Sequence, residues 1–318
     1  MFSRRIRLMA ELLRENRRPI WTSMFSTILT VFIGFATPML LAETIDAVIG
    51  EKPLHAPAFM VAWFERIGGR AFVVENLWIV AGILVLLSLF NGVFQYVKGR
   101  ASAQASETVA LTLRERLYGH LQRMTYGEHV KAETGDLIQR CTSDVDTVRR
   151  FLAMQLTEIV NAVIMIVLAA ALLLQRHVTL TLLSFVLMPI QLVFALVFFQ
   201  RVSKHFRIMD EAEGRMSAVL QENLTAVRVV RAFGRQQYEV EKFDGVSRDF
   251  RDKANRLMRH FATYWSVSDL ISFLQSGITL LFGAWYASQG VLTVGTLTLF
   301  LGYVNMMLWP IRRLGRIL

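Results

Sequence analysis

The sequence predicts an all-α, polytopic membrane protein with six transmembrane helices and long cytoplasmic helical extensions. Three observations lead to this fold class. Of its 318 residues, 54% are hydrophobic and the mean hydropathy is +0.41, whereas a soluble domain is about 45–50% apolar. Several apolar stretches are long enough to cross a bilayer as helices. The two longest charged stretches between them keep the apolar spacing of helices.

The charge balance fits a membrane protein better than a nucleic-acid binder. The formal net charge is +10 and the sequence pI is about 10.2. Proteins that bind nucleic acids share such a balance, but they are not this apolar, so we expect no nucleic-acid partner. Lys and Arg gather instead on cytoplasmic segments of membrane proteins. The single cysteine, Cys141, excludes an intrachain disulfide and a Cys-x-x-Cys site, and we expect no metal site.

The N-terminal segment is basic and amphipathic. Apolar Met9, Leu12 and Leu13 fall on one side of a helix, and arginines dominate the remainder. We interpret residues 1–19 as an elbow helix that lies in the inner membrane interface, with a solvated N-terminus as the alternative. The segment lacks the small-residue cleavage site of a signal peptide.

Six apolar spans follow in order, at about 21–45, 77–97, 159–174, 178–199, 269–288 and 297–309. The connections 50–75, 175–177 and 290–295 are short or balanced in charge. The N-terminus, residues 98–155, residues 201–261 and the C-terminus are basic. The positive-inside rule therefore predicts a multi-pass protein of the inner cell membrane with both termini cytoplasmic. Pro189 is expected to allow a kink in the fourth span.

The stretch 203–261 is rich in charged residues, yet its composition is not typical of a loop. It contains no Pro and only Gly214, Gly234 and Gly245. Its apolar residues recur at helical steps, as in Val219, Leu220 and Leu224. We expect two helices that leave the membrane, turn near 225–235 and return, each projecting roughly 40 Å at about 1.5 Å per residue.

The first basic excursion, 98–155, also has helical spacing. Gly135 is expected to end one short helix, and Asp136 or Ser143 to begin the next. One helical stripe then carries the apolar positions Leu137, Ile138, Cys141, Val145, Val148 and Leu152.

These excursions also carry a resemblance to a known family. Thr134-Gly-Asp-Leu-Ile-Gln-Arg140 followed by Ser143-Asp-Val-Asp146 resembles the first intracellular loop of ABC exporters of the multidrug and lipid type. The stretch 225–235 resembles their second intracellular loop, and 292–297 with 302–313 resemble their last turn and sixth span. The resemblance covers essentially the whole chain and implies the ABC transporter type 1 transmembrane fold for residues 20–318.

In that family, a six-helix domain is followed by a nucleotide-binding domain. This sequence contains no G-x-x-x-x-G-K-[ST] phosphate loop. We therefore expect a transmembrane half alone, a fragment that does not hydrolyse ATP by itself. The resemblance implies that ATP and Mg²⁺ belong to the absent nucleotide-binding domain. It also implies a second transmembrane half as partner, in a homodimer or a heterodimer.

The resemblance assigns two short coupling helices that would contact nucleotide-binding domains, the second of them on the partner subunit. The first comprises Thr125, Tyr126, Gly127, Glu128 and His129, followed by the loop motif residues Gly135, Asp136, Arg140 and Asp144. The second comprises Val227, Arg228, Val229, Val230, Arg231 and Phe233. An apolar face with a basic rim suits docking of a helix into a groove.

Polar residues near or within the spans are candidates for a substrate cavity. Glu158 and Asp269 lie near the inner ends of spans, where they could attract a cationic substrate or pair with a nearby Arg. Asn161, Gln275 and Asn305 lie deeper and could contact substrate or join helices by hydrogen bonds. Met306 could line the same cavity or face lipid.

Together these features favour the transmembrane subunit of an ATP-driven exporter of amphipathic drugs, lipids or peptides, working by alternating access. A secondary transporter is one alternative, although internal repeats and charges at mid-membrane are not evident. A membrane-anchored helical signalling or scaffold protein is another, although it would need none of the polar groups found within the spans.

Overall fold

A computed structural model describes residues 17–50, 66, 69–131 and 133–317. The predicted N-terminal elbow helix therefore lies almost wholly outside the described residues. The described residues are mostly helical and include no strand. Six of its helical segments are long and apolar enough to cross a membrane, as predicted. The main elements are α2 (Arg17–Glu43), η1 (Thr44–Ile49), α4 (Gly69–Glu75), α5 (Trp78–Leu121), α6 (Tyr126–Lys131), α7 (Thr134–Gln139), η2 (Arg140–Asp144), α8 (Val145–Arg150), η3 (Phe151–Leu156), α9 (Thr157–Arg176), α10 (Val178–Phe185), α11 (Met188–Ala232), α12 (Gln236–Ser288) and α13 (Val294–Ile317).

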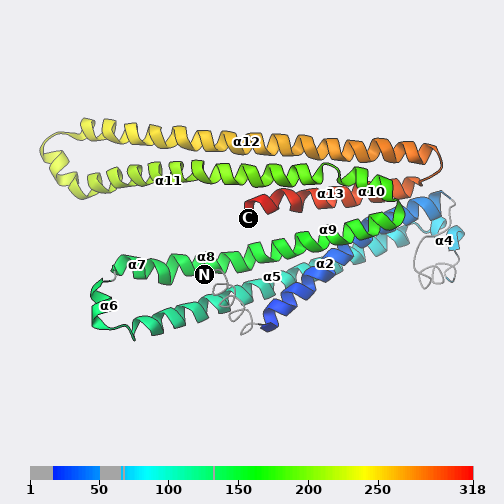
Figure 1. The fold of residues 1–318 in the computed structure, drawn as a ribbon, viewed down its shortest axis with the longest axis horizontal. Coiled ribbons are helices and arrows are strands. Elements are labelled where there is room, and N and C mark those ends of the chain that lie inside the picture. Colours follow the sequence, from blue (N-terminus) through cyan, green and yellow to red (C-terminus); the bar gives the residue numbers. More distant parts are fainter. Residues whose placement is uncertain (1–16, 51–65, 67–68, 132, 318) are drawn as a thin grey trace. The chain divides into compact units, whose positions relative to one another are not determined.

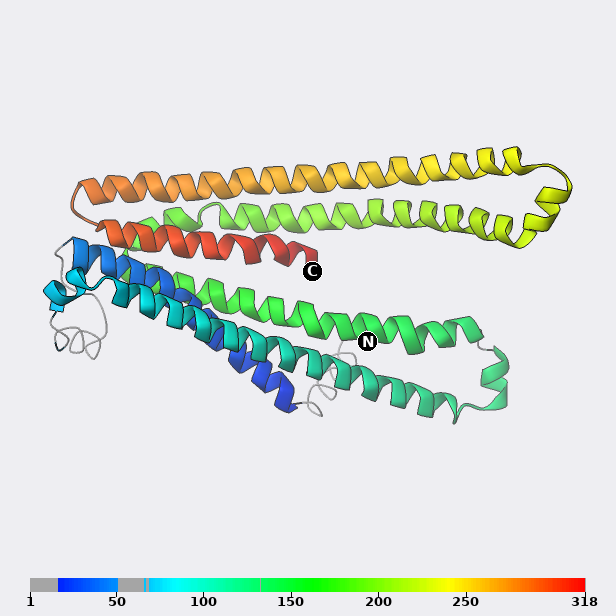
Figure 2. The same ribbon diagram turned by 180° about the vertical axis from the view of Figure 1, so that it is seen from behind.

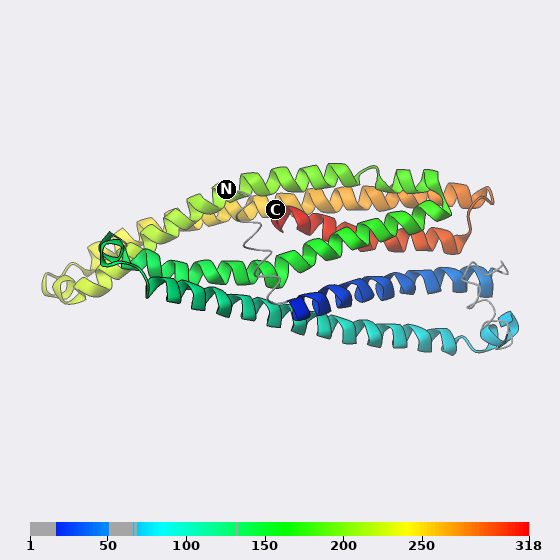
Figure 3. The same cartoon turned by 60° about the horizontal axis from the view of Figure 1, so that its bottom comes forward.

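The chain forms two compact units. The first comprises the residues up to Ser184 together with Ile278–Pro310. In it, α5 runs beside α2 and is followed by the returning chain of α8 and α9 (Figures 1 and 3). The face of α5 that is buried in this bundle consists mostly of small residues, namely Ala101, Ser102, Ala105, Ser106, Val109 and Ala110. Small side chains let helix backbones approach closely.

Helix α13 packs tightly against α2 in the first unit. The hydroxyl of Tyr303, which is 1% exposed, donates a hydrogen bond of 3.0 Å to the carbonyl of Phe35. At the start of α13, Gly295 lies so close to α2 that an added Cβ would be 2.2 Å from the carbonyl oxygen of Ala42. The backbone N–H of Gly295 donates to the Asp46 carboxylate at 2.8 Å, and the hydroxyl of Thr293 donates to the same group. A carboxylate at the N-terminus of α13 is favoured by the helix dipole.

The second unit comprises Phe185–Gly277 together with Ile311–Arg316. Within it, α11 and α12 lie side by side as one long antiparallel hairpin (Figure 2). Its apolar end is held by Tyr264, whose ring stacks on Phe198 with centroids 4.3 Å apart. The side chain of Gln191, 1% exposed, donates hydrogen bonds to the hydroxyls of Ser268 and Ser272 at 3.1 and 3.2 Å. These polar contacts join the fourth and fifth spans.

The fourth span is interrupted just before Pro189, since α10 ends at Phe185 and Pro189 lies in the first turn of α11. The chain thus departs from a straight helix near Pro189, as predicted, by a break in the helix. Proline fits the first turn since its missing N–H would have no helical partner there. The prediction for Gly135 was wrong, because this residue does not end a helix. It lies in the first turn of α7, which begins at Thr134 after Glu133 takes an extended conformation.

Candidate docking surfaces at the helical tips

The first tip is the turn between α5 and α6, in the first unit. The carboxylate of Glu128 accepts hydrogen bonds from the backbone N–H and the hydroxyl of Thr125, both at 2.8 Å. A Glu three residues after a Thr is the reciprocal half of a capping box, which fixes the start of a helix. The backbone bond from Thr125 is the main reason that the pKa of Glu128 is lowered. The sequence Thr-x-x-Glu therefore begins α6 at the position assigned to the first coupling helix.

The side chains of α6 up to His129 are exposed. The phenol ring of Tyr126 is 85% exposed, and Gly127 beside it is exposed as well. A ring nitrogen of His129 lies 3.0 Å from the carbonyl oxygen of Leu121, the last residue of α5. This contact folds α6 back across the end of α5. The short helix is thus held against the end of α5 and exposes an aromatic residue to solvent.

The loop motif after this tip carries its predicted residues on the outside. Asp136 and Arg140 form an ion pair of 2.8 Å on α7 and η2. Gly135 and Asp144 are exposed. The predicted apolar stripe turns inward at Val145 and Leu152, which are 3% and 8% exposed, whereas Ile138 is 59% exposed. The segment therefore packs against its neighbours from Val145 onward, whereas its residues before Val145 are mostly accessible to solvent.

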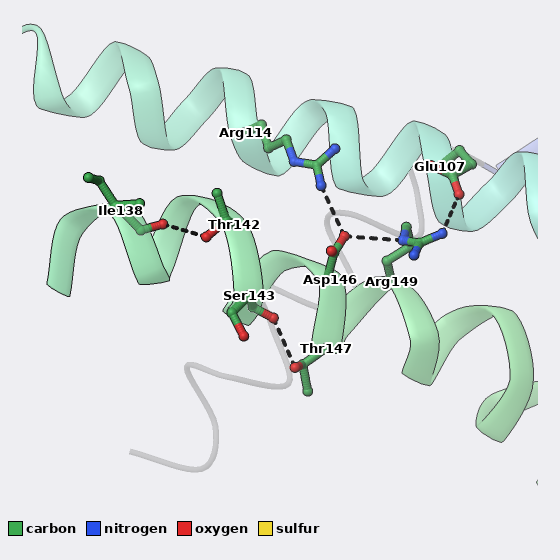
Figure 4. Close-up of polar contacts among 8 residues, drawn as sticks. All are labelled: Glu107, Arg114, Ile138, Thr142, Ser143, Asp146, Thr147 and Arg149. Atoms are coloured by element: carbon green, nitrogen blue, oxygen red, sulfur yellow. Dashed lines mark hydrogen bonds and ion pairs between the residues drawn. The ribbon is translucent and has the colours of Figure 1, made fainter. Parts of the chain in front are cut away.

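Charged residues tie this segment to α5, as Figure 4 shows, and of these the sequence analysis had named only Asp146, as part of a motif. The carboxylate of Asp146 accepts hydrogen bonds from Arg114 at 3.0 Å and from Arg149 at 3.3 Å. Arg149 also donates to Glu107 at 2.6 Å, and this bond is the main reason that the pKa of Arg149 is raised. The partners lie 32 and 42 positions apart in the chain, so no local pattern could reveal them. These contacts join α8 to α5, which are the two sides of the first helical hairpin, with its tip at α6.

The second tip is the turn between α11 and α12, in the second unit. Helix α11 ends in a Schellman motif: the N–H of Gly234 bonds to the carbonyl of Arg231, and the N–H of Arg235 to the carbonyl of Val230. Gly234 has φ +63°, a conformation that glycine adopts without steric cost. The segment assigned to the second coupling helix is not a separate helix, because its residues up to Ala232 continue α11.

The assigned residues of this tip are mostly exposed. Phe233 is 76% exposed, Val229 57% and Val227 41%. Arg228 and Arg231 are exposed, and Val230 is half-buried. Together with the first residues of α12, this end of α11 lines a groove of about 730 Å³. Apolar and basic side chains are thus both available at one end of the hairpin.

Polar contacts join α11 to α12, the two helices of the second hairpin, along their length. Lys242 donates to Glu222 at 2.8 Å, and Asn223 donates to Glu239 at 2.9 Å. Further along, Asp249 accepts from Lys253 at 2.6 Å and from Arg215 at 3.0 Å. The bond to Glu222 is the chief cause of the raised pKa of Lys242, and the bond from Lys253 is the chief cause of the lowered pKa of Asp249. Lys242 and Asp249 therefore stay ionised around neutral pH.

The candidate substrate residues are divided between the two units. Asp269 and Gln275 belong to α12 in the second unit, and the other four belong to α9 and α13 in the first. Asp269 pairs with Arg312 at 2.7 Å, and the Arg312 guanidinium lies 4.8 Å from the centre of the Trp265 ring. This favours the interpretation of Asp269 as an ion-pair partner.

The remaining candidates differ in exposure. Gln275 is 1% exposed. Glu158, Asn161 and Met306 are half-buried, and Asn305 is exposed. The amide of Asn161 donates to the sulfur of Met165 at 3.6 Å. Within the described ranges, no group of three His, Cys, Asp or Glu side chains is arranged to hold a metal ion.

Comparison with known proteins identifies the family to which this chain belongs. The family model of the ABC transporter transmembrane region matches residues 20–311. The chain belongs to this family, and it is a multi-pass membrane protein.

Three relatives are similar along nearly the whole chain. An uncharacterised ABC transporter ATP-binding protein of Bacillus subtilis, YknU, is 24% identical over 94% of this chain and 48% of its own length. A protein of Staphylococcus aureus, provisionally named as a multidrug export ATP-binding/permease protein, is 27% identical over 92% of this chain and 49% of its own. A similarly named protein of B. subtilis, YgaD, is 25% identical over 96% and 50%. The chain spans about half the length of the curated relatives it matches and corresponds to their transmembrane half.

Proposed function

We propose that this chain forms the substrate pathway of an ATP-driven exporter and transmits to it the movements of nucleotide-binding domains. One observation carries the proposal: helices far longer than a membrane end in exposed, partly apolar tips. Helix α5 has 44 residues, α11 has 45 and α12 has 53. At about 1.5 Å per residue, 44 residues extend roughly 66 Å, against a hydrocarbon core of about 30 Å. About half of each helix thus continues into water.

The proposed mechanism is mechanical. ATP and Mg²⁺ bind to nucleotide-binding domains, whose closure pushes the tip at α6 and the tip at Val227–Phe233. The second tip docks on the domain of the partner subunit. The ion pairs along both hairpins, such as Arg149 with Glu107 and Lys242 with Glu222, make them act as levers. Their movement converts an inward-facing arrangement of the spans to an outward-facing one. The tips and both termini lie in the cytoplasm, as the positive-inside rule predicts.

The substrate is an amphipathic drug, lipid or peptide. The provisional multidrug export names of two relatives support this class, as do the polar groups that interrupt the apolar spans. Two transmembrane halves, identical or different, enclose one pathway. The family match over residues 20–311 does not favour a secondary transporter or a helical scaffold.

The experiment joins a nucleotide-binding domain after the chain, in the order that the family resemblance implies, and measures ATP hydrolysis with and without an amphipathic drug. The drug is expected to change the rate. Tyr126→Ala and Phe233→Ala are each expected to abolish most of this response, because loss of an aromatic anchor weakens docking by about 2 kcal/mol.

Matched controls are available on α5 and α11 away from the tips. Leu111 on α5 is 56% exposed and Phe206 on α11 is 53% exposed, so Leu111→Ala and Phe206→Ala also remove exposed apolar surface. They are expected to keep the response. If the tip variants hydrolyse ATP and respond to the drug as these controls do, the lever mechanism is wrong.

A further inference from the structure

The same basic motif occurs on both helices of the second hairpin. Helix α11 carries Arg-x-x-Lys-His at 201–205, and α12 carries Arg-x-x-Arg-His at 256–260. In each motif the first basic residue is followed by the others at i+3 and i+4, a spacing that places all three on one face of a helix. Both motifs belong to the second unit. Neither is part of the tips or of the candidate substrate residues.

The two motifs lie beside each other because α11 and α12 run antiparallel (Figure 2). The rings of His205 and His260 meet between the helices, with centroids 4.3 Å apart. The stacked pair of Phe198 and Tyr264 lies on the membrane side of this contact. The cations of the two motifs therefore form one group, the basic belt, which consists of Arg201, Lys204, Arg256 and Arg259.

The positive charge of the basic belt is not compensated. Its four side chains are exposed and form no ion pair or hydrogen bond within the part of the chain that the structure describes. The sequence places no Asp or Glu at 159–209 or at 253–268. The carboxylates next in sequence are Asp210, Asp252 and Asp269. None of them pairs with the belt, since Asp252 and Asp269 bind arginines outside it at 2.9 and 2.7 Å, and Asp210 forms no ion pair with a described residue.

The basic belt lies at the level expected for lipid headgroups. The fourth apolar span ends at about residue 199, so Arg201 lies at its end. On α12, Tyr264 and Trp265 lie on the membrane side of Arg259, and Tyr and Trp are typical of the membrane interface. Clusters of Lys and Arg next to a span attract anionic lipids.

An exposed apolar surface continues from the basic belt toward the membrane. Val197 and Val193 precede Arg201 by about one and two turns on the same face of α11, and they are 40% and 59% exposed. On α12, Leu270 follows Arg259 by about three turns of 3.6 residues and is 59% exposed. The surface thus changes from cationic to apolar in the same order as a phospholipid changes from headgroup to acyl chain.

We propose that the basic belt is a docking surface for anionic phospholipids of the bilayer. The phosphate groups lie over the four cations, and the acyl chains lie against the exposed apolar face of α11 and α12. Charge complementarity favours an anionic over a zwitterionic lipid, because the zwitterionic headgroup carries a cation of its own. The surface requires no nucleotide-binding domain, so its test is independent of the proposed function.

The test compares phosphatidylglycerol with phosphatidylcholine of the same acyl chains beside the basic belt. The full chain with Cys141→Ser and Val197→Cys is labelled with a fluorophore and placed in nanodiscs that contain both lipids. One lipid at a time is brominated, so that quenching reports how often it lies next to the label. Phosphatidylglycerol is expected to be preferred about fivefold or more, the contribution of one Lys or Arg beside an anionic membrane surface. Molar salt is expected to weaken this preference by screening.

Paired variants separate the belt from the net charge of the protein. In the labelled background, Arg201→Gln/Arg259→Gln is expected to abolish most of the preference, and Arg201→Lys/Arg259→Lys to retain it. Arg248→Gln/Arg251→Gln removes the same charge from α12 nearer the tip, where both arginines are bound by carboxylates, and is expected to retain the preference. A label at Leu281→Cys, in the last third of α12 where Leu281 is 66% exposed, is expected to report no preference.

Three results would overturn the proposal. An unchanged preference in Arg201→Gln/Arg259→Gln would show that the belt does not select the lipid, and an equal preference at Leu281→Cys would show that the lipid is not localised there. Loss of the preference in inorganic phosphate, but not in sodium chloride of equal ionic strength, would assign the cations to a soluble anion. Both arginines are exposed and bind no carboxylate, so Gln strands no partner, and the melting temperature of each variant checks that it folds.

Discussion

Single glycines decide how closely two elements approach. At Gly295 an added Cβ would lie 2.2 Å from the Ala42 carbonyl oxygen and 2.5 Å from the Asp46 carboxyl carbon. Both belong to the rigid end of α2 and η1, so α13 would have to move away. We predict that Gly295→Ala destabilises the protein by about 1–3 kcal/mol, the usual cost of overpacking.

Thermal unfolding in detergent measures this effect. The control is Gly277→Ala in α12, where an added Cβ meets no atom within 4 Å. That change is expected to leave the melting temperature the same or raise it, since Ala is favoured over Gly in a helix by about 1 kcal/mol. An equal effect of the two substitutions would contradict the close approach at Gly295.

Glu128 makes the cap of α6 sensitive to pH. Its pKa lies below the ordinary value of 4.5, chiefly through the hydrogen bond from the Thr125 N–H. A depressed carboxyl pKa contributes stability that is present above the ordinary value and is lost as pH falls through the lowered one. We therefore predict that the Thr125 amide becomes less protected from exchange as pH is lowered below about 4.5, after correction for intrinsic rates. Glu128→Gln should remove this pH dependence; its persistence in that variant would assign it to another group.

At the scale of elements, long-range ion pairs stiffen the first hairpin. Arg149 joins α8 to α5 through Glu107 and also binds Asp146, which is itself held by Arg114. We predict that Arg149→Ala accelerates amide exchange in α7 and α8 and leaves the membrane spans unaffected. The effect is modest because exposed ion pairs contribute little individually.

Arg150, exposed on the same helix, provides the matched control. Arg150→Ala is expected to leave exchange in α7 and α8 unchanged. In a double-mutant cycle, Glu107→Ala should have little further effect once Arg149 is removed, because the two residues act through one contact. Fully additive effects would show that the pair does not brace the hairpin.

At the scale of the whole molecule, the distribution of basic residues predicts sidedness. In a Cys141→Ser background, Tyr126→Cys at the first tip and Gln289→Cys in the turn before α13 introduce single exposed thiols. We predict that a membrane-impermeant maleimide added to intact cells labels only the second, and that both are labelled after the membrane is opened. Labelling of Tyr126→Cys from outside would place the hairpins on the wrong side for nucleotide-binding domains.

Much of the architecture was predictable because its causes are local. Six apolar stretches predicted six spans, and the absence of proline from 203–261 predicted the long hairpin of α11 and α12. The turn at 290–295 was predicted from its glycines and is seen before α13, with φ +73° at Gly290. The predicted sidedness, the roles of the tip residues and the partners remain predictions.

Other features depended on more than a local pattern. Pro189 was expected inside a kinked helix, but the chain breaks before it, so that it occupies a first turn. Val227–Phe233 was expected as a separate short helix, but most of it continues α11 because Gly234 places the turn later.

The sequence by itself determined the class of structure: membrane spans joined by long helical excursions, with a resemblance that identified the family. Hydropathy and helical periodicity suffice for this, because they act over a few turns of one segment. Only the tertiary structure decided which charges and which cavities these helices form. Arg176 meets Glu43 and Arg149 meets Glu107 across 133 and 42 positions of sequence. Such pairs arise from the rotation and offset of packed helices, which interactions between distant segments set.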